Sequence, residues 1–175
     1  MRRVTLFIAM SLDGFIADTR GGVDWLAGQD DRAEEDSYGQ FIRDIDTVVM
    51  GGRTYRQIST ELSPESWPYR GLTSYVVTRR RQTDREDIVF TAEHPCDLVR
   101  RLRLMDGRGI WICGGAQVAQ QLVEADLIDC YHLSVIPTLL GNGIPLFGAL
   151  PCERKLRLAG TRTYNGITDL IYEQR

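Results

Sequence analysis

The most informative feature of this chain is the stretch Ile110-Trp111-Ile112-Cys113-Gly114-Gly115-Ala116-Gln117-Val118. Four apolar residues, as in a buried strand, run directly into two glycines, and a helix-forming segment, 116–122, follows at once. Glycines allow a ligand to approach the backbone closely, and the start of a helix offers unpaired N–H groups with a partial positive charge. A strand that ends in glycines and opens a helix therefore predicts a binding site for the phosphates of a nucleotide or dinucleotide.

A second apolar run ends in the same way, since Val48-Val49-Met50 is followed by Gly51-Gly52. In a parallel sheet both strands end at the same edge, where ligands bind in the crevice at which the strand order reverses. Two glycine breaks at that edge suit the two ends of a cofactor that contains a pyrophosphate. The three-glycine dinucleotide fingerprint is absent from the sequence, because Gln117 and Ala119 follow the other break. Two tight turns are the alternative interpretation.

Arginines follow two of the strands at the same predicted edge. Arg53-Thr54 comes after the break at Gly51-Gly52, and Thr78-Arg79-Arg80-Arg81 comes after an apolar run, 74–77. Arginines near a dinucleotide site can hold the 2′-phosphate that distinguishes NADP from NAD. The alternative is ordinary surface charge.

The remaining segments alternate between strand-like and helix-like patterns. Apolar and β-branched runs predict strands over 4–10, 47–50, 74–78, 88–90, 109–113 and 128–136. Helical spacing and helix-start signals predict helices over 32–44, 53–58, 95–105 and 116–122. Asn165-Gly166 is a hairpin turn signal, with strands over 155–163 and 168–173 on either side. This order indicates a single α/β domain, residues 1–175, with a sheet that is parallel in the middle and antiparallel at its C-terminal edge.

Composition favours a soluble globular protein: 43% of the 175 residues are hydrophobic, and the net charge of −3 argues against dedicated nucleic-acid binding. The apolar run 4–10 is far shorter than the roughly 20 residues of a membrane span, and no signal-peptide cleavage site follows it. The four cysteines are irregularly spaced, so we expect reduced thiols and a cytoplasmic protein. Neither His94 nor His132 has a neighbouring ligand-type residue, so no metal site is expected.

Residues 11–30 are rich in glycine and aspartate and predict a long loop, which in a compact domain is usually functional. Asp13-Gly14 suits a tight turn within this loop, which could form a flap over a ligand. Trp25 is either a lid residue or a plug of the core. The acidic run 30–36 suits the start of a helix, where the helix dipole favours carboxylates.

Five blocks in this order resemble the dihydrofolate reductase superfamily. They are 11–17 (Ser-Leu-Asp-Gly-Phe-Ile-Ala), 24–26 (Asp-Trp-Leu), 49–55 (Val-Met-Gly-Gly-Arg-Thr-Tyr), 76–79 (Val-Val-Thr-Arg) and 112–116 (Ile-Cys-Gly-Gly-Ala). The resemblance covers nearly the whole chain. It is closest to the branch typified by the C-terminal reductase domain of the bifunctional riboflavin-biosynthesis deaminase-reductase, whose glycine-rich loop before the final hairpin is similar to 139–147. It implies a three-layer fold, in which a twisted, mostly parallel sheet with an antiparallel C-terminal hairpin carries helices on both faces, and it implies NADPH as the cofactor.

The resemblance also assigns roles to individual residues. Contact with the cofactor phosphates is implied for Gly51, Gly52, Arg53 and Thr54, and with the adenosine 2′-phosphate for Thr78, Arg79 and Arg80. The pyrophosphate would lie against Gly114, Gly115, Ala116, Gln117 and Val118, and the nicotinamide side against Ala9, Ile16 and Ala17. Trp25 and Tyr38 are the candidate substrate contacts, with Asp13 on the mobile loop beside them.

In folate reductases a carboxylate on the helix after the first loop anchors the pterin, and counting back from Gly51 places Glu35 or Asp36 near that position. Asp13, Glu35 and Asp36 are therefore the candidates for delivering the proton that accompanies hydride transfer. The expected function is an NADPH-dependent reductase of a small heterocycle, resembling 5-amino-6-(5-phosphoribosylamino)uracil reductase. The alternatives are a stand-alone dihydrofolate reductase, a non-catalytic NADP(H)-binding protein, or a structural domain whose glycines only make turns.

Related reductase domains tend to dimerise, so a homodimer is expected. The apolar strand Cys130 to Ile136 and the loop Leu139 to Phe147 could supply its contact surface. The only other expected partner is the small heterocyclic substrate.

Overall fold

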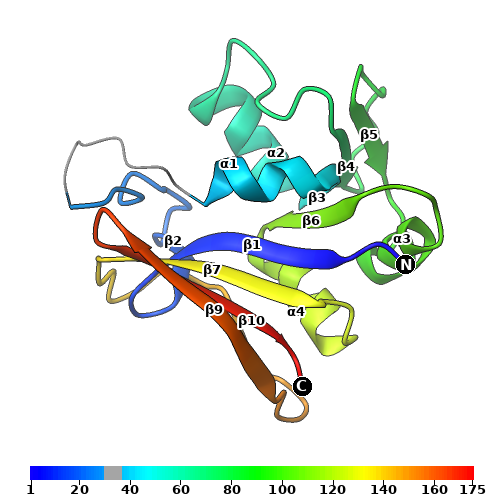
Figure 1. Ribbon diagram of the computed structural model, residues 1–175. Coiled ribbons are helices and arrows are strands. Elements are labelled where there is room, and N and C mark those ends of the chain that lie inside the picture. Colours follow the sequence, from blue (N-terminus) through cyan, green and yellow to red (C-terminus); the bar gives the residue numbers. More distant parts are fainter. Residues whose placement is uncertain (30–36) are drawn as a thin grey trace.

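The structure, a computed structural model, describes residues 1–29 and 37–175. An eight-stranded sheet forms its centre, in the order β5-β4-β3-β6-β1-β7-β10-β9 (Figure 1). Strands β5 to β7 of this order run parallel, whereas β10 and β9 are antiparallel. The strands are β1 (Val4–Ser11), β3 (Ile45–Gly51), β4 (Thr73–Val77), β5 (Ile88–Thr91), β6 (Gly109–Gly114), β7 (Cys130–Ile136), β9 (Leu156–Tyr164) and β10 (Ile167–Gln174).

Helices cover both faces of this sheet. One apolar core joins Leu98 of α3 (Pro95–Arg103) and Leu122 of α4 (Ala116–Glu124) to one face of the central strands. The other core joins Tyr55 of α2 (Gly52–Gln57), and Ile58 of the π-helical turn η2 (Ile58–Leu62) that continues it, to Trp111 on the opposite face. The predicted three-layer arrangement is thus confirmed. Within the described part of the chain, no helix is both long and apolar enough to cross a membrane.

The C-terminal hairpin forms as predicted. Asn165 and Gly166 connect β9 to β10 with φ angles of 45° and 74°. Two successive residues with positive φ match the right-handed twist of the strands, and asparagine and glycine tolerate that conformation best. The antiparallel edge of the sheet therefore follows directly from a local sequence signal.

The first loop is more ordered than predicted. Residues 11–30 contain a short strand, β2 (Phe15–Ala17), which pairs antiparallel with β8 (Ile144–Pro145) in a separate two-stranded sheet. Its partner lies more than 120 residues away in sequence, as Ala17 opposite Ile144 illustrates, so no local pattern could reveal it. The helix predicted over 32–44 is described only in its second part, α1 (Tyr38–Phe41) and the 3-10 turn η1 (Ile42–Asp44).

Candidate functional site

The two Gly-Gly pairs lie side by side at one edge of the sheet, where the chain turns to one face after β3 and to the other face after β6. Strands β3 and β6 are parallel neighbours, so both end at the same edge. After β3 the chain enters α2 on one face, and after β6 it enters α4 on the other. The carboxyl ends of two such strands form the crevice in which open α/β sheets bind their ligands.

Side chains of neighbouring segments lie close to three glycines of this crevice. A Cβ atom would lie 3.4 Å from Val118 Cγ2 if built on Gly51, and 3.1 Å from Thr78 Oγ1 if built on Gly52. On Gly115 it would lie 3.3 Å from Thr54 Oγ1. Six of the predicted cofactor residues, three of them glycines, thus line one narrow space.

Two helices begin in this space. Gly51 is the N-cap of α2 and Gly115 is the N-cap of α4, and neither residue has a side chain to cover the first turn. Gly114 has a φ of +119°, which favours glycine, and the Gly114–Gly115 peptide bond is cis. Ala116 and Gln117 open α4, with Gln117 exposed. Open backbone N–H groups, the dipole of α4 and threonine hydroxyls fit a pyrophosphate.

The candidate 2′-phosphate residues lie beside this space. Thr78 directly follows β4 and lies against Gly52, and its Oγ1 accepts a hydrogen bond of 3.1 Å from the backbone N–H of Arg80. The side chains of Arg53, Arg79 and Arg80 are exposed. Three guanidinium groups near one edge of the sheet can supply an anion-binding surface.

The candidate nicotinamide residues are divided between two strands. Ala9 is half-buried on β1, on the same face as Phe7 and Trp111. Ile16 and Ala17 lie on β2, where Ile16 packs against the α3/α4 core and Ala17 is buried opposite Ile144. Of the three residues, Ala9 lies nearest to the polar groups described next, because it is in register with Ser134 on β7.

A polar cluster extends from Ala9 across the sheet. It is formed by the buried residues Ser37, His132, Ser134 and Asp169 and the half-buried Tyr164. Asp169 has no exposed surface and accepts hydrogen bonds from the hydroxyl groups of Ser134 (2.6 Å), Ser37 and Tyr164 (3.4 Å). His132 Nε2 lies 3.2 Å from Asp169 Oδ2. Burial raises the pKa of Asp169, but His132, Ser134 and Ser37 outweigh burial and hold that pKa below its ordinary value.

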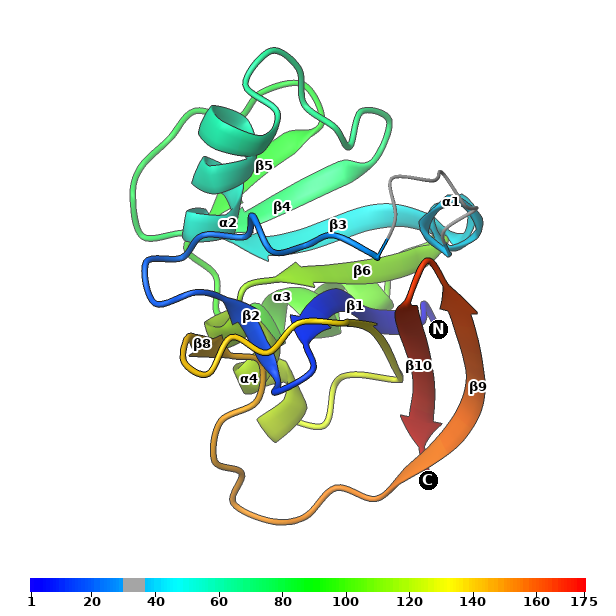
Figure 2. The same cartoon turned by 90° about the vertical axis from the view of Figure 1, so that its left-hand side faces the viewer.

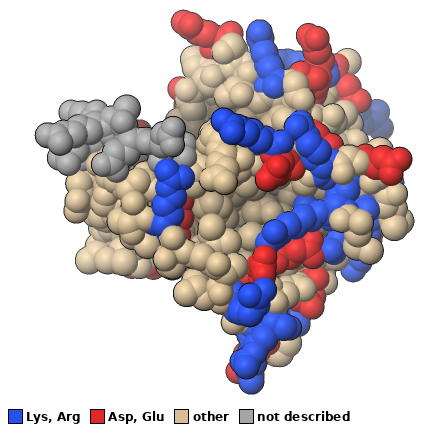
Figure 3. Space-filling model, viewed as in Figure 1, with Lys and Arg blue, Asp and Glu red and all other residues tan. Residues whose placement is uncertain are grey.

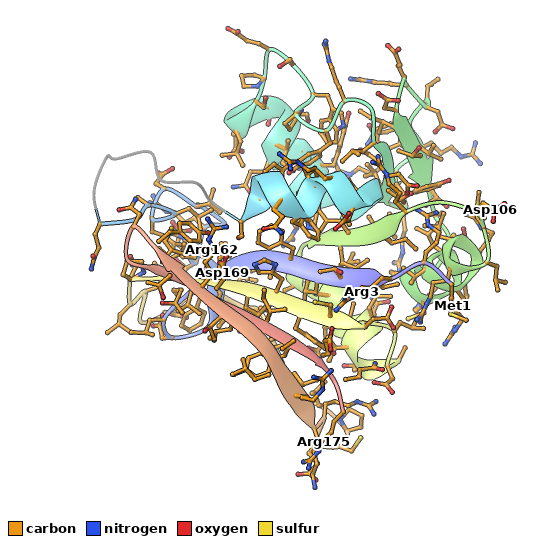
Figure 4. The ribbon with its side chains drawn as sticks, in the orientation of Figure 1. Met1, Arg3, Asp106, Arg162, Asp169 and Arg175 are labelled. Atoms are coloured by element: carbon orange, nitrogen blue, oxygen red, sulfur yellow. The ribbon has the colours of Figure 1, made fainter. Side chains whose placement is uncertain are left out.

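The sequence patterns did not predict this cluster. Two signals for it exist: Cys130, His132 and Ser134 alternate with apolar residues along β7, and Asp169 directly precedes the apolar run 170–172 of β10. Figure 4 shows Asp169 close to Arg162, its register partner on β9. The cation–π contact of Arg162 with the Tyr164 ring, 5.6 Å from the centroid, places a charge near the end of the hairpin.

The loop after β2 crosses the same edge of the sheet (Figure 2). Asp18 shapes it by accepting hydrogen bonds from the backbone N–H groups of Arg20 (2.7 Å) and Gly22 (2.9 Å), which lower the pKa of Asp18. Gln57 at the end of α2 holds one side of the loop through Gly21 O (2.8 Å). At its far side, Gln29 N–H donates to Asn165 O of the hairpin turn (3.0 Å). The loop therefore reaches from α2 to β9 and β10.

The candidate substrate residues lie on either side of this loop. Trp25 belongs to the loop itself, and its Nε1–H donates to Gly22 O at 3.3 Å. Tyr38 opens α1, and its ring contacts Trp111 (centroids 5.7 Å apart) and Phe7 (6.3 Å). Tyr38 thus belongs to the aromatic layer beside Ala9, on the face that carries His132.

Of the candidate proton donors, Glu35 and Asp36 lie outside the described residues. Asp13 is exposed, and its carboxylate accepts hydrogen bonds from Ser11 Oγ (2.6 Å), Gly141 N (2.7 Å) and Leu140 N (3.1 Å). These bonds lower the pKa of Asp13, the Ser11 hydroxyl most of all. A proton donor needs a raised pKa, so the geometry favours Asp13 as an anchor for the loop before β8.

The opposite edge of the sheet is dominated by paired charges (Figure 3). Hollows of about 410 and 460 Å³ lie there, both lined by Met1, Arg2 and Arg103. Their arginines are already paired, Arg2 with Asp46 and Arg103 with Asp129 (2.7 Å). We therefore assign these hollows no ligand and place the site at the carboxyl edge.

Comparison with known proteins shows which family this chain belongs to. Residues 2–169 match the model of the RibD C-terminal domain. The chain belongs to the RibD C-terminal domain family. A Bacillus subtilis (strain 168) relative, the uncharacterized protein YwjB, is 37% identical over 172 residues, which cover 98% of this chain and 97% of YwjB. A second one, the uncharacterized protein YyaP, is 28% identical and covers 98% of this chain and 94% of its own length.

Solved structures of the family share the architecture. A Shewanella sp. PV-4 structure whose printed name is riboflavin biosynthesis protein matches with a TM-score of 0.83 and 28% identity. The match covers 100% of this chain and 99% of the Shewanella chain. A Thermotoga maritima diaminohydroxyphosphoribosylaminopyrimidine deaminase/5-amino-6-(5-phosphoribosylamino)uracil reductase matches with a TM-score of 0.76 and 15% identity, over 99% of this chain and 57% of its own. The last likeness shows the fold alone. The predicted membership of this branch of the dihydrofolate reductase superfamily is confirmed.

Proposed function

We propose that this RibD C-terminal domain protein is an NADPH-dependent reductase that transfers hydride to a small heterocyclic substrate. The observation that carries the proposal is the meeting of two glycine-capped helix starts with Thr54 and Thr78 at the edge shared by β3 and β6. The Thermotoga maritima relative, whose printed name includes a uracil reductase, supports a pyrimidine-type acceptor.

In this proposal different residues of the site bind different parts of the cofactor. The helix starts at Gly51 and Gly115 bind the phosphates, and Arg79 and Arg80 bind the 2′-phosphate. When bound, NADPH supplies the hydride, so the chain has to orient the reacting groups and keep out water. The loop held between Gln57 and Asn165 provides the cover.

The test is a titration of the purified protein with NADPH and with NADH, followed by tryptophan fluorescence. NADPH should bind tightly and NADH more weakly. Arg79→Ala with Arg80→Ala should weaken NADPH binding by about tenfold or more and leave NADH binding unchanged, because a charged hydrogen bond to phosphate is worth roughly 1.5–3 kcal/mol. Thr54→Val should weaken both nucleotides alike, since both contain the pyrophosphate.

Arg100→Ala is the matched control, because Arg100 is an exposed arginine on α3 that pairs with Asp97. It should leave both affinities unchanged. Methotrexate binding in the same titration would support a folate reductase instead. No response to either nucleotide, with an unchanged melting temperature, would refute the proposed function.

A further inference from the structure

A tyrosine and a cysteine form a polar pair on the aromatic side of the sheet, separate from the cluster around Asp169. Tyr69 Oη and Cys113 Sγ lie 3.7 Å apart, and either atom can be the donor. Cys113 lies on β6 directly before Gly114, where the predicted pyrophosphate site begins. Both residues of the pair are half-buried, so the pair borders the site and is not sealed inside the core.

This pair faces the same side of the sheet as the predicted nicotinamide contact. Phe7 and Cys113 pack against the same apolar core, and Ala9 follows Phe7 by two residues. Side chains alternate along a strand, so Ala9 shares that face. Leu6 pairs with Ile112 in parallel register, and Cys113 is therefore level with Phe7. With strands about 4.8 Å apart and a rise of about 3.3 Å per residue, the Cα atoms of Ala9 and Cys113 are roughly 8 Å apart.

Neighbouring rings fix the position of the Tyr69 phenol. Its ring meets Trp111 edge-on (centroids 5.0 Å apart, planes at 78°) and meets Trp67 in the same way (5.3 Å, 86°). Trp67 is tied to β4, because its Nε1–H donates to the hydroxyl of the buried Ser74 (3.2 Å). The N–H of Leu72 donates to Tyr69 O (3.1 Å), which closes a turn at this residue. The hydroxyl is thus held in place before a ligand binds, which lowers the entropic cost of binding.

The thiol is a poor partner for this hydroxyl. Sulfur is a weak acceptor and S–H is a weak donor, and their separation of 3.7 Å is long. Burial raises the pKa of Tyr69 well above its ordinary value, and the neighbouring Cys113 and Tyr38 raise it further. Burial also raises the pKa of Cys113 to about 11. Near pH 7 the phenol is therefore a neutral donor, and a stronger acceptor than the thiol can replace its partner.

The groups around the pair favour a flat, uncharged ligand. Tyr38, a predicted substrate contact, meets Trp111 edge-on (5.7 Å), and Trp111 is also the ring against which Tyr69 packs. Aromatic side chains stack well on planar rings. A charged acceptor would lose its hydration among these rings, whereas a carbonyl oxygen accepts a hydrogen bond at a smaller desolvation cost. The acceptor that suits this hydroxyl is thus the carbonyl of a planar ring.

We propose that the Tyr69 hydroxyl binds a carbonyl oxygen of the substrate ring in place of the Cys113 thiol, and so selects planar lactam heterocycles; this rests on the proposed reductase function. In the free protein the hydroxyl contacts the thiol. In the complex it donates to the ring carbonyl and holds the ring beside Ala9. Tyr69 is thus a substrate-binding residue that determines specificity, and it takes no part in proton transfer.

The test compares two small ligands of the same size and shape. Isocytosine is a lactam, and 2-aminopyrimidine is the same ring without the carbonyl group. Each is titrated into the full chain saturated with NADP⁺, which cannot donate a hydride, and binding is followed by ligand NMR. The wild-type protein should bind isocytosine about three- to tenfold more tightly than 2-aminopyrimidine, the usual effect of one neutral hydrogen bond.

Variants assign that preference to one hydroxyl. Tyr69→Phe keeps the ring and should bind NADPH as tightly as the wild type does. It should lose affinity for isocytosine about three- to tenfold and bind 2-aminopyrimidine unchanged, so the preference disappears. Tyr75→Phe is the matched control, because Tyr75 packs against the core on the opposite face, beside Arg101. It should keep the full preference.

Three results would overturn the role of Tyr69: no binding of isocytosine, equal affinity of the wild-type protein for the two rings, or a preference that survives in Tyr69→Phe. In all three the binding of NADPH, titrated separately, stays intact. A wild-type protein that binds neither NADPH nor NADP⁺ is a different result, which overturns the reductase function on which the role of Tyr69 rests.

Discussion

Replacing Ser134 by alanine removes one hydrogen bond from the most deeply buried carboxylate of the site. Ser134 Oγ donates to Asp169 Oδ1 at 2.6 Å, and both residues are buried. A hydrogen bond to a charged group contributes about 1.5–3 kcal/mol, and here no water can replace the lost donor. Ser134→Ala should therefore lower the free energy of unfolding by about 1.5–3 kcal/mol, and the melting temperature by about 3–12 °C.

The same variant should show a characteristic pH dependence. The pKa of Asp169 is lower in the folded protein than in the unfolded chain, so the carboxylate stabilises the fold above its unfolded pKa of about 3.9. That stabilisation is lost as the pH falls through the folded pKa. The difference between wild type and Ser134→Ala should therefore be complete at pH 7 and shrink below about pH 4.

Urea unfolding followed by tryptophan fluorescence measures both effects. Ser59→Ala is the control, because its hydroxyl donates to Arg56 O at an exposed position (3.2 Å) and should contribute little. Ser134→Ala combined with Asp169→Asn should be less destabilised than the sum of the single variants, since both remove the same bond. A loss below about 0.5 kcal/mol at pH 7, or a loss that does not change with pH, would refute the reasoning.

Three further predictions concern the loops and the assembly. Asp13→Asn leaves one side-chain oxygen to accept the hydrogen bonds of two backbone N–H groups, those of Leu140 and Gly141. These two amides should therefore exchange faster with solvent, while the amides of β7 stay protected. Unchanged exchange at Leu140 and Gly141 would contradict the anchoring role of Asp13. Gly166→Ala should destabilise the fold by about 1 kcal/mol or more in urea unfolding, because the φ of Gly166 is +74° and a Cβ there would overlap Gln29. Gly160→Ala on β9 is the control and should be neutral, since the atom nearest to its Cβ would be 3.9 Å away. The strand Cys130 to Ile136 was wrongly predicted as a dimer contact, because β7 is buried in the sheet between β1 and β10. We propose a homodimer that uses the loop 139–147, through Leu139 (70% exposed), and the adjacent Leu12 (63% exposed). Light scattering should give a dimer mass that Leu139→Ser lowers and Leu104→Ser on the far edge does not; a monomeric wild type would refute it.

Local sequence signals were enough to predict the strands of the sheet and the edge at which two of them end in glycines. Apolar runs that end in Gly51-Gly52 and Gly114-Gly115 predict buried parallel strands and glycine-capped helix starts, and Asn165-Gly166 predicts the hairpin. These signals are local, because turn chemistry and hydrophobic period act over a few residues. The structure realises each of them within a few residues of its predicted place.

Only the tertiary structure brought together the other half of the site. Asp169 and Ser37 are 132 residues apart, and β2 pairs with β8 across a similar distance in sequence. In the sequence His132 stands without a ligand-type neighbour, and strand register alone places it against a buried carboxylate. The physical reason is that burial and charge pairing depend on which strands lie side by side, and no local pattern encodes that order.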